Sequence, residues 1–271
     1  FVRIACASAR SAPPIITARG ILRTVGPRVL LQDVEVIGRQ GARVGLVGRN
    51  GTGKSTLLRI VAGLDQPTTG QVLLDGAPVQ GPGADRGMVF QSYTLFPWLT
   101  IEQNIRFGLR ERGMPERAQK ERADYFIAKV GLRGFEQHFP KQLSGGMQQR
   151  TAIARALAND PKILLLDEPF GALDAFTREE LWCTLRDLHA AQGFNVILVT
   201  HDLRESVFLA DTVYVMSKSP GRFVVKKEIE LPRPRDLEIT YTKEFTDIVH
   251  DLRGHIGAMR KQGAAAAGAV Q

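Results

Sequence analysis

Hydrophobic and polar positions along the chain form short apolar runs that alternate with helical patterns. Several runs are continuous, as in strands covered on both faces, and most are followed by a helix-forming segment. The predicted strands are residues 43–47, 71–74, 88–90, 163–167, 196–200 and 213–216. This alternation predicts an α/β fold, with a mostly parallel sheet and helices on both of its faces.

A strand-free stretch interrupts the alternation. Between about Thr100 and Ala158 the chain shows helical patterns, including one over residues 115–130. We therefore expect a helical insertion subdomain at about residues 95–158. The early strands, among them the one that enters the turn at Asp75-Gly76, are expected to form a small antiparallel β subdomain.

The two ends of the chain differ in composition from the rest. The start is rich in alanine, serine, arginine and proline, and the end is rich in alanine and glycine. We expect a disordered leader at residues 1–14, one folded domain at 15–255 and a flexible C-terminal tail at 256–271. No apolar run approaches the ~20 residues that span a bilayer, so any membrane association should be peripheral.

The net charge of +8 is concentrated near the start of the chain. Five arginines precede Asp33, the first acidic residue, and the rest of the chain is nearly neutral. These are Arg3, Arg10, Arg19, Arg23 and Arg28. Such a basic leader fits a solvated tail at least as well as a DNA-binding face, and we expect no nucleic-acid partner. Cys6 and Cys183 have no neighbours at metal-ligand spacing, so neither a disulfide framework nor a zinc site is expected.

A glycine-rich segment follows the strand at 43–47 and opens a helix. It fits the pattern G-x-x-x-x-G-K-[ST], in which backbone N–H groups point inward at a phosphate and the helix N-terminus adds positive potential. Lys54 is expected to reach the β- and γ-phosphates, and the Ser55 hydroxyl to bind Mg²⁺. The expected ATP-binding residues are Gly48, Arg49, Asn50, Gly51, Thr52, Gly53, Lys54, Ser55 and Thr56.

A second apolar strand, about 110 residues further on, ends in two carboxylates. In a parallel sheet, Asp167 emerges at the carboxyl end of this strand beside the phosphate loop, where it can hold Mg²⁺ through water. Glu168 follows directly. It is the candidate for polarising the attacking water, because phosphoryl transfer relies on positioning and electrostatics more than on covalent chemistry.

The run Leu-Ser-Gly-Gly-Met-Gln-Gln-Arg at residues 143–150 resembles the signature motif of ABC ATPases. The resemblance extends over roughly residues 15–255. It implies a P-loop NTPase core of the ABC type, ATP and Mg²⁺ as ligands, and ATP hydrolysis. It also implies that two copies face each other, with each ATP held between one P-loop and the signature of the other copy. The residues expected to bind ATP in this way are Ser144, Gly145, Gly146 and Gln148.

Other landmarks of the same family follow in order. Gln91 resembles the Q-loop glutamine, Asp174 the D-loop residue that crosses the dimer interface, and His201 the switch histidine that contacts the γ-phosphate. The resemblance thus gives a catalytic set of Glu168, His201 and Gln91, and a Mg²⁺ set of Ser55, Gln91 and Asp167. One position departs from the family. Val25 stands where an aromatic ring usually stacks on adenine, so weaker or less base-selective nucleotide binding is expected.

The segment Gln91–Thr100 is similar to the nitrate, sulfonate, taurine and bicarbonate group of bacterial importers. In importers this region receives a helix of the membrane permease, and Phe96 and Trp98 are natural anchors for it. The alternative is that both rings pack inside the helical subdomain. The resemblance implies a second copy, a permease and, indirectly, a solute-binding protein as partners, at the cytoplasmic face of the inner membrane.

Two rival functions remain open from the sequence. A soluble ABC ATPase that acts on DNA or ribosomes is one, although the long coiled coil or second cassette of such proteins is absent. An ATPase that serves an exporter is the other, and only the resemblance of residues 96–100 argues against it. The transported solute does not touch this subunit, so the sequence does not identify it.

Overall fold

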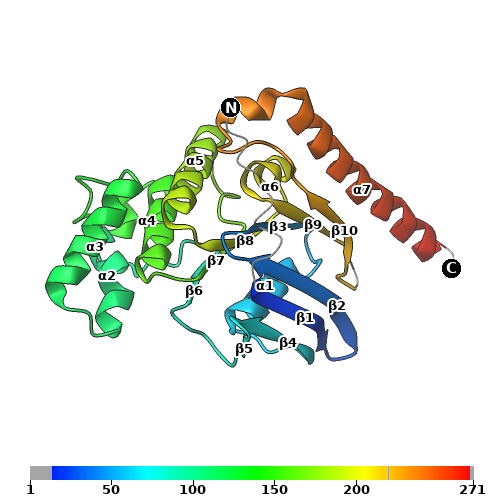
Figure 1. Cartoon of the computed structure of the whole chain (residues 1–271), viewed down its shortest axis with the longest axis horizontal. Helices are drawn as coiled ribbons and strands as arrows, with labels where there is room; N and C mark the ends of the chain where they lie inside the picture. The colour runs from blue at the N-terminus through cyan, green and yellow to red at the C-terminus, as the bar shows by residue number, and fades with distance from the viewer. Residues whose placement is uncertain (1–13, 219, 269–271) are drawn as a thin grey trace, which may run out of the picture.

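A computed structural model of the chain describes residues 14–218 and 220–268, with side chains as far as Met259 (Figure 1). The expected disordered leader lies outside the described residues, apart from Pro14, which begins the first strand. No helix in the described part of the chain is both long enough and apolar enough to cross a membrane.

The centre of the molecule is a six-stranded sheet in the order β10-β9-β3-β8-β7-β6. All neighbouring strands are parallel except β10, which pairs antiparallel with β9. The strands are β3 (Arg43–Gly48), β6 (Arg86–Val89), β7 (Ile163–Asp167), β8 (Asn195–Thr200), β9 (Thr212–Met216) and β10 (Phe223–Glu228). Each predicted buried strand is therefore present, because its continuous apolar run is covered on both faces.

Alternate residues of the inner strands enter two separate cores. Leu164 and Leu166 of β7 pack with helices α5 (Ala175–Gln192) and α6 (Leu203–Leu209), together with the helical subdomain. Ile163 and Leu165 of the same strand pack on the other face with helix α1 (Lys54–Ala62) and the antiparallel sheet. The two-residue period of a strand divides the side chains in this way, and the sheet is sealed on both sides.

The antiparallel subdomain has the strand order β2-β1-β4-β5. Its strands are β1 (Pro14–Val25), β2 (Arg28–Arg39), β4 (Thr69–Leu74) and β5 (Ala77–Pro78). Asp75 and Gly76 both have left-handed backbone angles, with φ of 50° and 78°. Two positive φ values are typical of the tight turn that suits a twisted hairpin, as the Asp-Gly pair predicted.

The helical subdomain projects from one edge of the central sheet (Figure 1). It contains α2 (Ile101–Glu111), α3 (Glu116–Lys129), the 3₁₀ helix η2 (Pro140–Gln142) and α4 (Gly145–Ala158). Thr100 begins α2 with a capping box, in which its hydroxyl accepts from the amide of Gln103 and the Gln103 side chain accepts from the Thr100 amide. No strand lies between residues 100 and 158, as predicted.

The chain ends in the 3₁₀ helix η3 (Leu237–Tyr241) and the long helix α7 (Lys243–Gly268). This helix crosses residue 255, where we expected the folded domain to end. The boundary falls inside a helix because Ile256 and Met259 still pack against the main core. Most of the expected flexible tail at 256–271 is accordingly helical, as far as Gly268.

Candidate nucleotide-binding site

The phosphate loop joins β3, an inner strand of the central sheet, to helix α1. Gly51 and Gly53 have φ angles of 79° and 90°. A Cβ atom at Gly53 would lie 2.6 Å from Cδ2 of Leu31, so both the backbone angle and the packing require glycine there. Helix α1 begins at the next residue without a side-chain cap, and its first N–H groups are therefore available to an anion.

Lys54 lies under this loop and is 4% exposed. Its Nζ donates to the carbonyl oxygens of Gly48, at 2.6 Å, and of Arg49, at 3.0 Å. Burial lowers the pKa of Lys54, while the nearby carboxylates of Glu168 and Asp167 oppose that shift. The lysine is thus held by the loop that it serves, with its charge directed at the inside of the cradle.

Ser55 and Asp167 meet across the space between α1 and β7. The Ser55 hydroxyl donates to Oδ1 of Asp167 at 2.8 Å. Burial is the largest influence on Asp167 and raises its pKa, although the bond from Ser55 acts in the opposite direction. A hydroxyl and a carboxylate are hard oxygen ligands, the type that Mg²⁺ prefers, so the residues fit this metal. The described residues hold no group of three or more acidic, histidine or cysteine side chains placed for a metal.

Glu168 and His201 form a second pair at the ends of β7 and β8. Nδ1 of His201 lies 3.1 Å from Oε2 of Glu168. The carboxylate is 15% exposed, whereas the imidazole is 56% exposed. Glu168 has a left-handed backbone, with φ of 47°, and its amide donates to the carbonyl of Val199 at 2.8 Å. The backbone bond and the histidine together fix the direction of the carboxylate.

Gln91 lies at the same edge of the sheet. It follows β6, which runs parallel to β7 with Val89 opposite Leu166, so Gln91 stands level with the two acidic residues. Its side chain is exposed. The structure therefore brings together the predicted residues of the phosphate loop, Asp167, Glu168, His201 and Gln91, because parallel strands present their carboxyl ends at one edge.

The signature residues form a separate turn at the start of α4. The Ser144 hydroxyl caps this helix and accepts from the amide of Met147 at 3.3 Å. Gly145 lies against the hydroxyl of Tyr93, and Gly146 against Thr177, so closely that an added Cβ would lie within 2.6 Å of either neighbour. Among the described residues, no hydrogen bond joins this turn to the phosphate loop.

Two predicted site residues make local contacts. The amide group of Gln148 donates to the carbonyl of Leu143 at 3.2 Å, so its side chain folds back on its own turn. Asp174 caps α5 and accepts from the amide and the hydroxyl of Thr177, at 3.0 and 2.7 Å. These bonds lower the pKa of Asp174. Both residues shape the helix starts that surround the signature turn.

Sequence reasoning missed one pair of charged residues close to this site. Arg178 donates to Oδ2 of Asp202 at 3.1 Å and to the carbonyl of Leu173 at 3.0 Å. Asp202 caps helix α6 directly after His201. The sequence Asp-Leu-Arg-Glu at residues 202–205 carries a helix-start signal that could have identified Asp202. Nothing in the sequence pairs it with Arg178.

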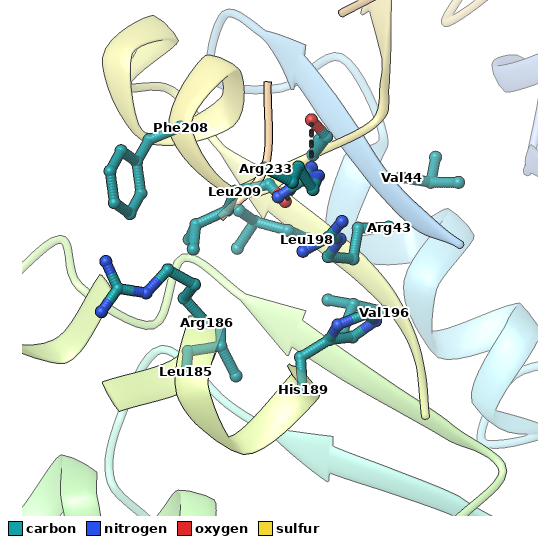
Figure 2. A pocket seen from close by; sticks show the side chains of 11 residues that line it. Arg43, Val44, Leu185, Arg186, His189, Val196, Leu198, Phe208, Leu209 and Arg233 are labelled. Atoms are coloured by element: carbon teal, nitrogen blue, oxygen red, sulfur yellow. Dashed lines mark hydrogen bonds between the residues drawn. The ribbon is translucent and has the colours of Figure 1, made fainter. Parts of the chain in front are cut away.

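A small cavity lies between helix α5 and the central sheet, near the start of strands β3 and β8 (Figure 2). Arg43, His189 and Arg233 gather on one side of it and Arg186 lies on the other. Its volume of about 10 Å³ is at the lower limit for a single water molecule. This cavity is therefore not a nucleotide site. The candidate site is the open edge of the sheet around Lys54.

The comparison with known protein families decides the family of this chain. Residues 31–171, which include the phosphate loop, the signature turn and the Asp167–Glu168 pair, match the family described as ABC transporter. The chain belongs to the ABC transporter family. As an ABC ATPase it hydrolyses ATP to drive transport, and its fold is the mixed, mostly parallel sheet with antiparallel and helical subdomains that the sequence predicted.

Individual ABC proteins are similar over most of this chain. The nitrate import ATP-binding protein NrtD of a Synechocystis strain is 48% identical over 220 residues, which are 81% of this chain and 82% of that protein. The taurine import ATP-binding protein TauB of Burkholderia pseudomallei is 47% identical over 208 residues, 77% and 80% of the two chains. A dimeric structure of the ATP-binding cassette MJ0796, bound to ADP and phosphate, has a TM-score of 0.70 and 31% identity, and covers 80% of this chain and 100% of that chain.

Proposed function

We propose that this ABC ATPase energises the import of a small oxyanion or sulfonate, such as nitrate, taurine or an alkanesulfonate. The observation that carries the proposal is the similarity, at 47–48% identity, to ATPases of nitrate and taurine import over about four fifths of their lengths. The solute passes through a permease and does not contact this subunit. The particular substrate is therefore a property of its partners.

The phosphate loop holds the triphosphate of ATP. Backbone amides of residues 48–56 surround the phosphates, and Lys54 exchanges its bonds with two loop carbonyls for bonds with phosphate oxygens. Ser55 and Asp167, assisted by Gln91, would hold Mg²⁺, and this ion would supply charge stabilisation at the phosphates.

Glu168 orients the water that attacks the γ-phosphate. A carboxylate is suited to this role when its direction is fixed, because phosphoryl transfer depends on position more than on covalent chemistry. His201 contacts Glu168 through Nδ1, and its Nε2, when it carries a proton, donates to an oxygen of the γ-phosphate. The exposed imidazole can therefore report the presence of that phosphate to the carboxylate.

Two copies of the chain complete the site. Ser144, with the amides of Gly145 and Gly146, opens helix α4 and offers a second anion-binding helix start. Since no hydrogen bond links this turn to the phosphate loop of its own described chain, the ATP that it binds belongs to a second copy. The MJ0796 cassette is dimeric in a post-hydrolysis state with ADP and phosphate bound, which supports a paired arrangement. In the pair proposed for this chain, binding of ATP closes the two copies and release after hydrolysis reopens them.

The permease binds at the segment Gln91–Thr100. Trp98 is 69% exposed, whereas the ring of Phe96 is half-buried and packs 4.5 Å from the ring of Phe107. The two aromatic residues therefore differ. Phe96 supports the surface and Trp98 is the anchor for a helix of the permease. The protein accordingly lies at the cytoplasmic face of the membrane that contains this partner.

Exchange of Glu168 for glutamine tests the proposed chemistry. The Glu168→Gln variant should bind ATP and form a stable dimer, and kcat should fall at least about 100-fold, because the general base is lost while the phosphate loop is intact. Phosphate release measures turnover and sedimentation measures the dimer. The control is Glu111→Gln, at an exposed glutamate that ends helix α2. Normal turnover by Glu168→Gln would remove this residue from its assigned role.

A further inference from the structure

Arg178 connects three parts of the molecule that lie around the nucleotide site. It belongs to the first turns of α5, the helix that Asp174 caps. One terminal nitrogen donates to Oδ2 of Asp202, at 3.1 Å, and the other donates to the carbonyl of Leu173, at 3.0 Å. The side chains of Arg178 and Asp202 are 28% and 25% exposed, so solvent screens this pair less than it screens a surface ion pair.

The Asp202 end of this connection holds the switch histidine. Oδ1 of Asp202 accepts from the amides of Arg204 and Glu205, at 2.8 and 3.4 Å, and so starts helix α6. The other oxygen of the same carboxylate accepts from Arg178. His201 is the residue immediately before Asp202, and its ring contacts Glu168. A shift of the Asp202 carboxylate therefore moves the backbone that carries the histidine.

The Leu173 end of the connection leads to the signature turn. Leu173 immediately precedes Asp174, and its buried side chain lies 3.5 Å from the position that a Cβ of Gly145 would occupy. Arg178 holds the carbonyl of this leucine, so the same guanidinium fixes the residue that supports Gly145.

A third observation concerns Phe176, which is 82% exposed on the same helix turn. In the proposed pair, this exposed ring is accessible to the second copy.

We infer that Arg178 is a positioning residue that links the two nucleotide sites of a pair. It joins His201, which serves the ATP on its own phosphate loop, to the turn at Ser144, which serves the ATP of the second copy. This inference rests on the proposed paired arrangement. Arrival of a γ-phosphate at His201 moves Asp202, and Arg178 transmits that movement to Leu173 and the signature turn. The ion pair thereby makes hydrolysis at one site depend on occupancy of the other.

A double-mutant cycle tests the link. Arg178→Met removes the guanidinium, and Asp202→Asn removes the charge but keeps an oxygen that can cap α6. Phosphate release by the purified full-length chain, measured against ATP concentration, gives kcat, KM and the Hill coefficient. Each variant should lower kcat about tenfold and bring the Hill coefficient close to 1, and KM should stay within about twofold of wild type. The double variant should be no worse than either single one.

Arg186→Met provides a matched control. Arg186 lies two turns further along the same helix and makes the same kind of contacts, one with the carboxylate of Asp187 at 2.7 Å and one with the carbonyl of Arg235 at 2.8 Å. Loss of such an arginine for structural reasons alone should lower the melting temperature and leave the Hill coefficient unchanged. The Arg178 and Asp202 variants should instead lose cooperativity, with a Hill coefficient close to 1, and keep the melting temperature of the parent.

The inference would be overturned by a Hill coefficient of 1 for the wild-type chain, by unchanged cooperativity in Arg178→Met, or by additive losses in the double variant. Equal loss of cooperativity in Arg186→Met would do the same, because it would point to a general effect of disturbing α5. Absence of any ATP hydrolysis by the wild-type chain, alone or with its permease, is a different result. It contradicts the proposed function itself.

Discussion

Val25 ends strand β1 and pairs with Arg28 across the hairpin turn. Its side chain is 56% exposed. The side chain is therefore accessible to the base of a nucleotide. A valine offers less area for stacking than an aromatic ring does. We therefore expect this chain to bind the base with only modest affinity although its phosphate loop is complete.

A tyrosine at this position should restore the stacking area. Val25→Tyr should tighten ATP binding by about 1 kcal/mol, or roughly fivefold in Kd, as measured by isothermal titration calorimetry. The control is Val224→Tyr, since Val224 is also a half-exposed strand valine, on β10. If Val25→Tyr binds ATP no better than the parent, Val25 does not stand at the adenine.

The residues of the candidate site differ in how well the sequence predicted them. Lys54, Ser55 and Asp167 could be placed because a short motif and a strand end carry their geometry. The link between Arg178 and Asp202 could not, because the two residues are separated by a helix and a strand, and only the tertiary packing brings them together. Gln148 was predicted to bind ATP in the second copy, which the bond of its side chain to Leu143 leaves untested.

Elements with both faces buried were the most predictable. Strands β7 and β8 are continuous apolar runs, and no other structure suits such short runs in this context. Strand β1 was less clear from the sequence. Its pairing with β2 shifts register between Ala18 and Ile21, so its buried residues do not alternate regularly. The end of α7 could not be located, because packing of Ile256 and Met259 extends the helix.

Helix α5 is joined to the turn between β2 and β3 by a histidine whose titration should affect stability. His189 bonds through Nε2 to the carbonyl of Gly41, at 3.1 Å, and its ring packs edge-on against Phe194 near Arg43 and Arg233 (Figure 2). Burial, with Arg43 as a further cause, lowers the pKa of His189 from 6.5 to about 4. The folded state thus favours the neutral ring, whereas the unfolded chain binds a proton at about pH 6.5.

Stability from this residue is present above about pH 6.5 and is lost as the pH falls towards 4. The melting temperature should therefore fall over this range. His189→Gln keeps a donor for Gly41 and does not titrate, so the melting temperature of that variant should depend less on pH between 4 and 6.5. His250→Gln, at an exposed histidine of α7, should behave as the parent does. Parallel pH curves for all three proteins would contradict the assignment.

At the scale of the whole molecule, the helical subdomain and the C-terminal helix α7 lie on opposite sides of the central sheet (Figure 1). Trp98 lies in the segment before helix α2, and its ring packs against Phe96, which is not part of the phosphate loop. Removal of the Trp98 ring should therefore leave basal hydrolysis unchanged. It should weaken binding of the permease by about 2 kcal/mol or more, roughly thirtyfold in Kd. Tyr241, 72% exposed on η3, has a comparable exposed ring away from that surface.

The Trp98→Ala variant can be examined in proteoliposomes that contain the cognate permease. Stimulation of ATP hydrolysis by the permease should be lost at protein concentrations that saturate the parent, whereas Tyr241→Ala should be stimulated normally. Unchanged stimulation of Trp98→Ala would show that the permease binds elsewhere. A fall in basal hydrolysis would instead place Trp98 in the catalytic machinery.

The left-handed backbone of Glu168 affects how substitution libraries at this position should be interpreted. With φ at 47°, the position resists β-branched residues for steric reasons, whereas asparagine, aspartate and glycine adopt this conformation more readily. Inactive threonine or isoleucine clones would then report a distorted loop after β7, and give no information about the carboxylate. An unchanged thermal transition shows that a replacement preserves the turn. Only for such replacements can a loss of activity be attributed to the missing carboxylate.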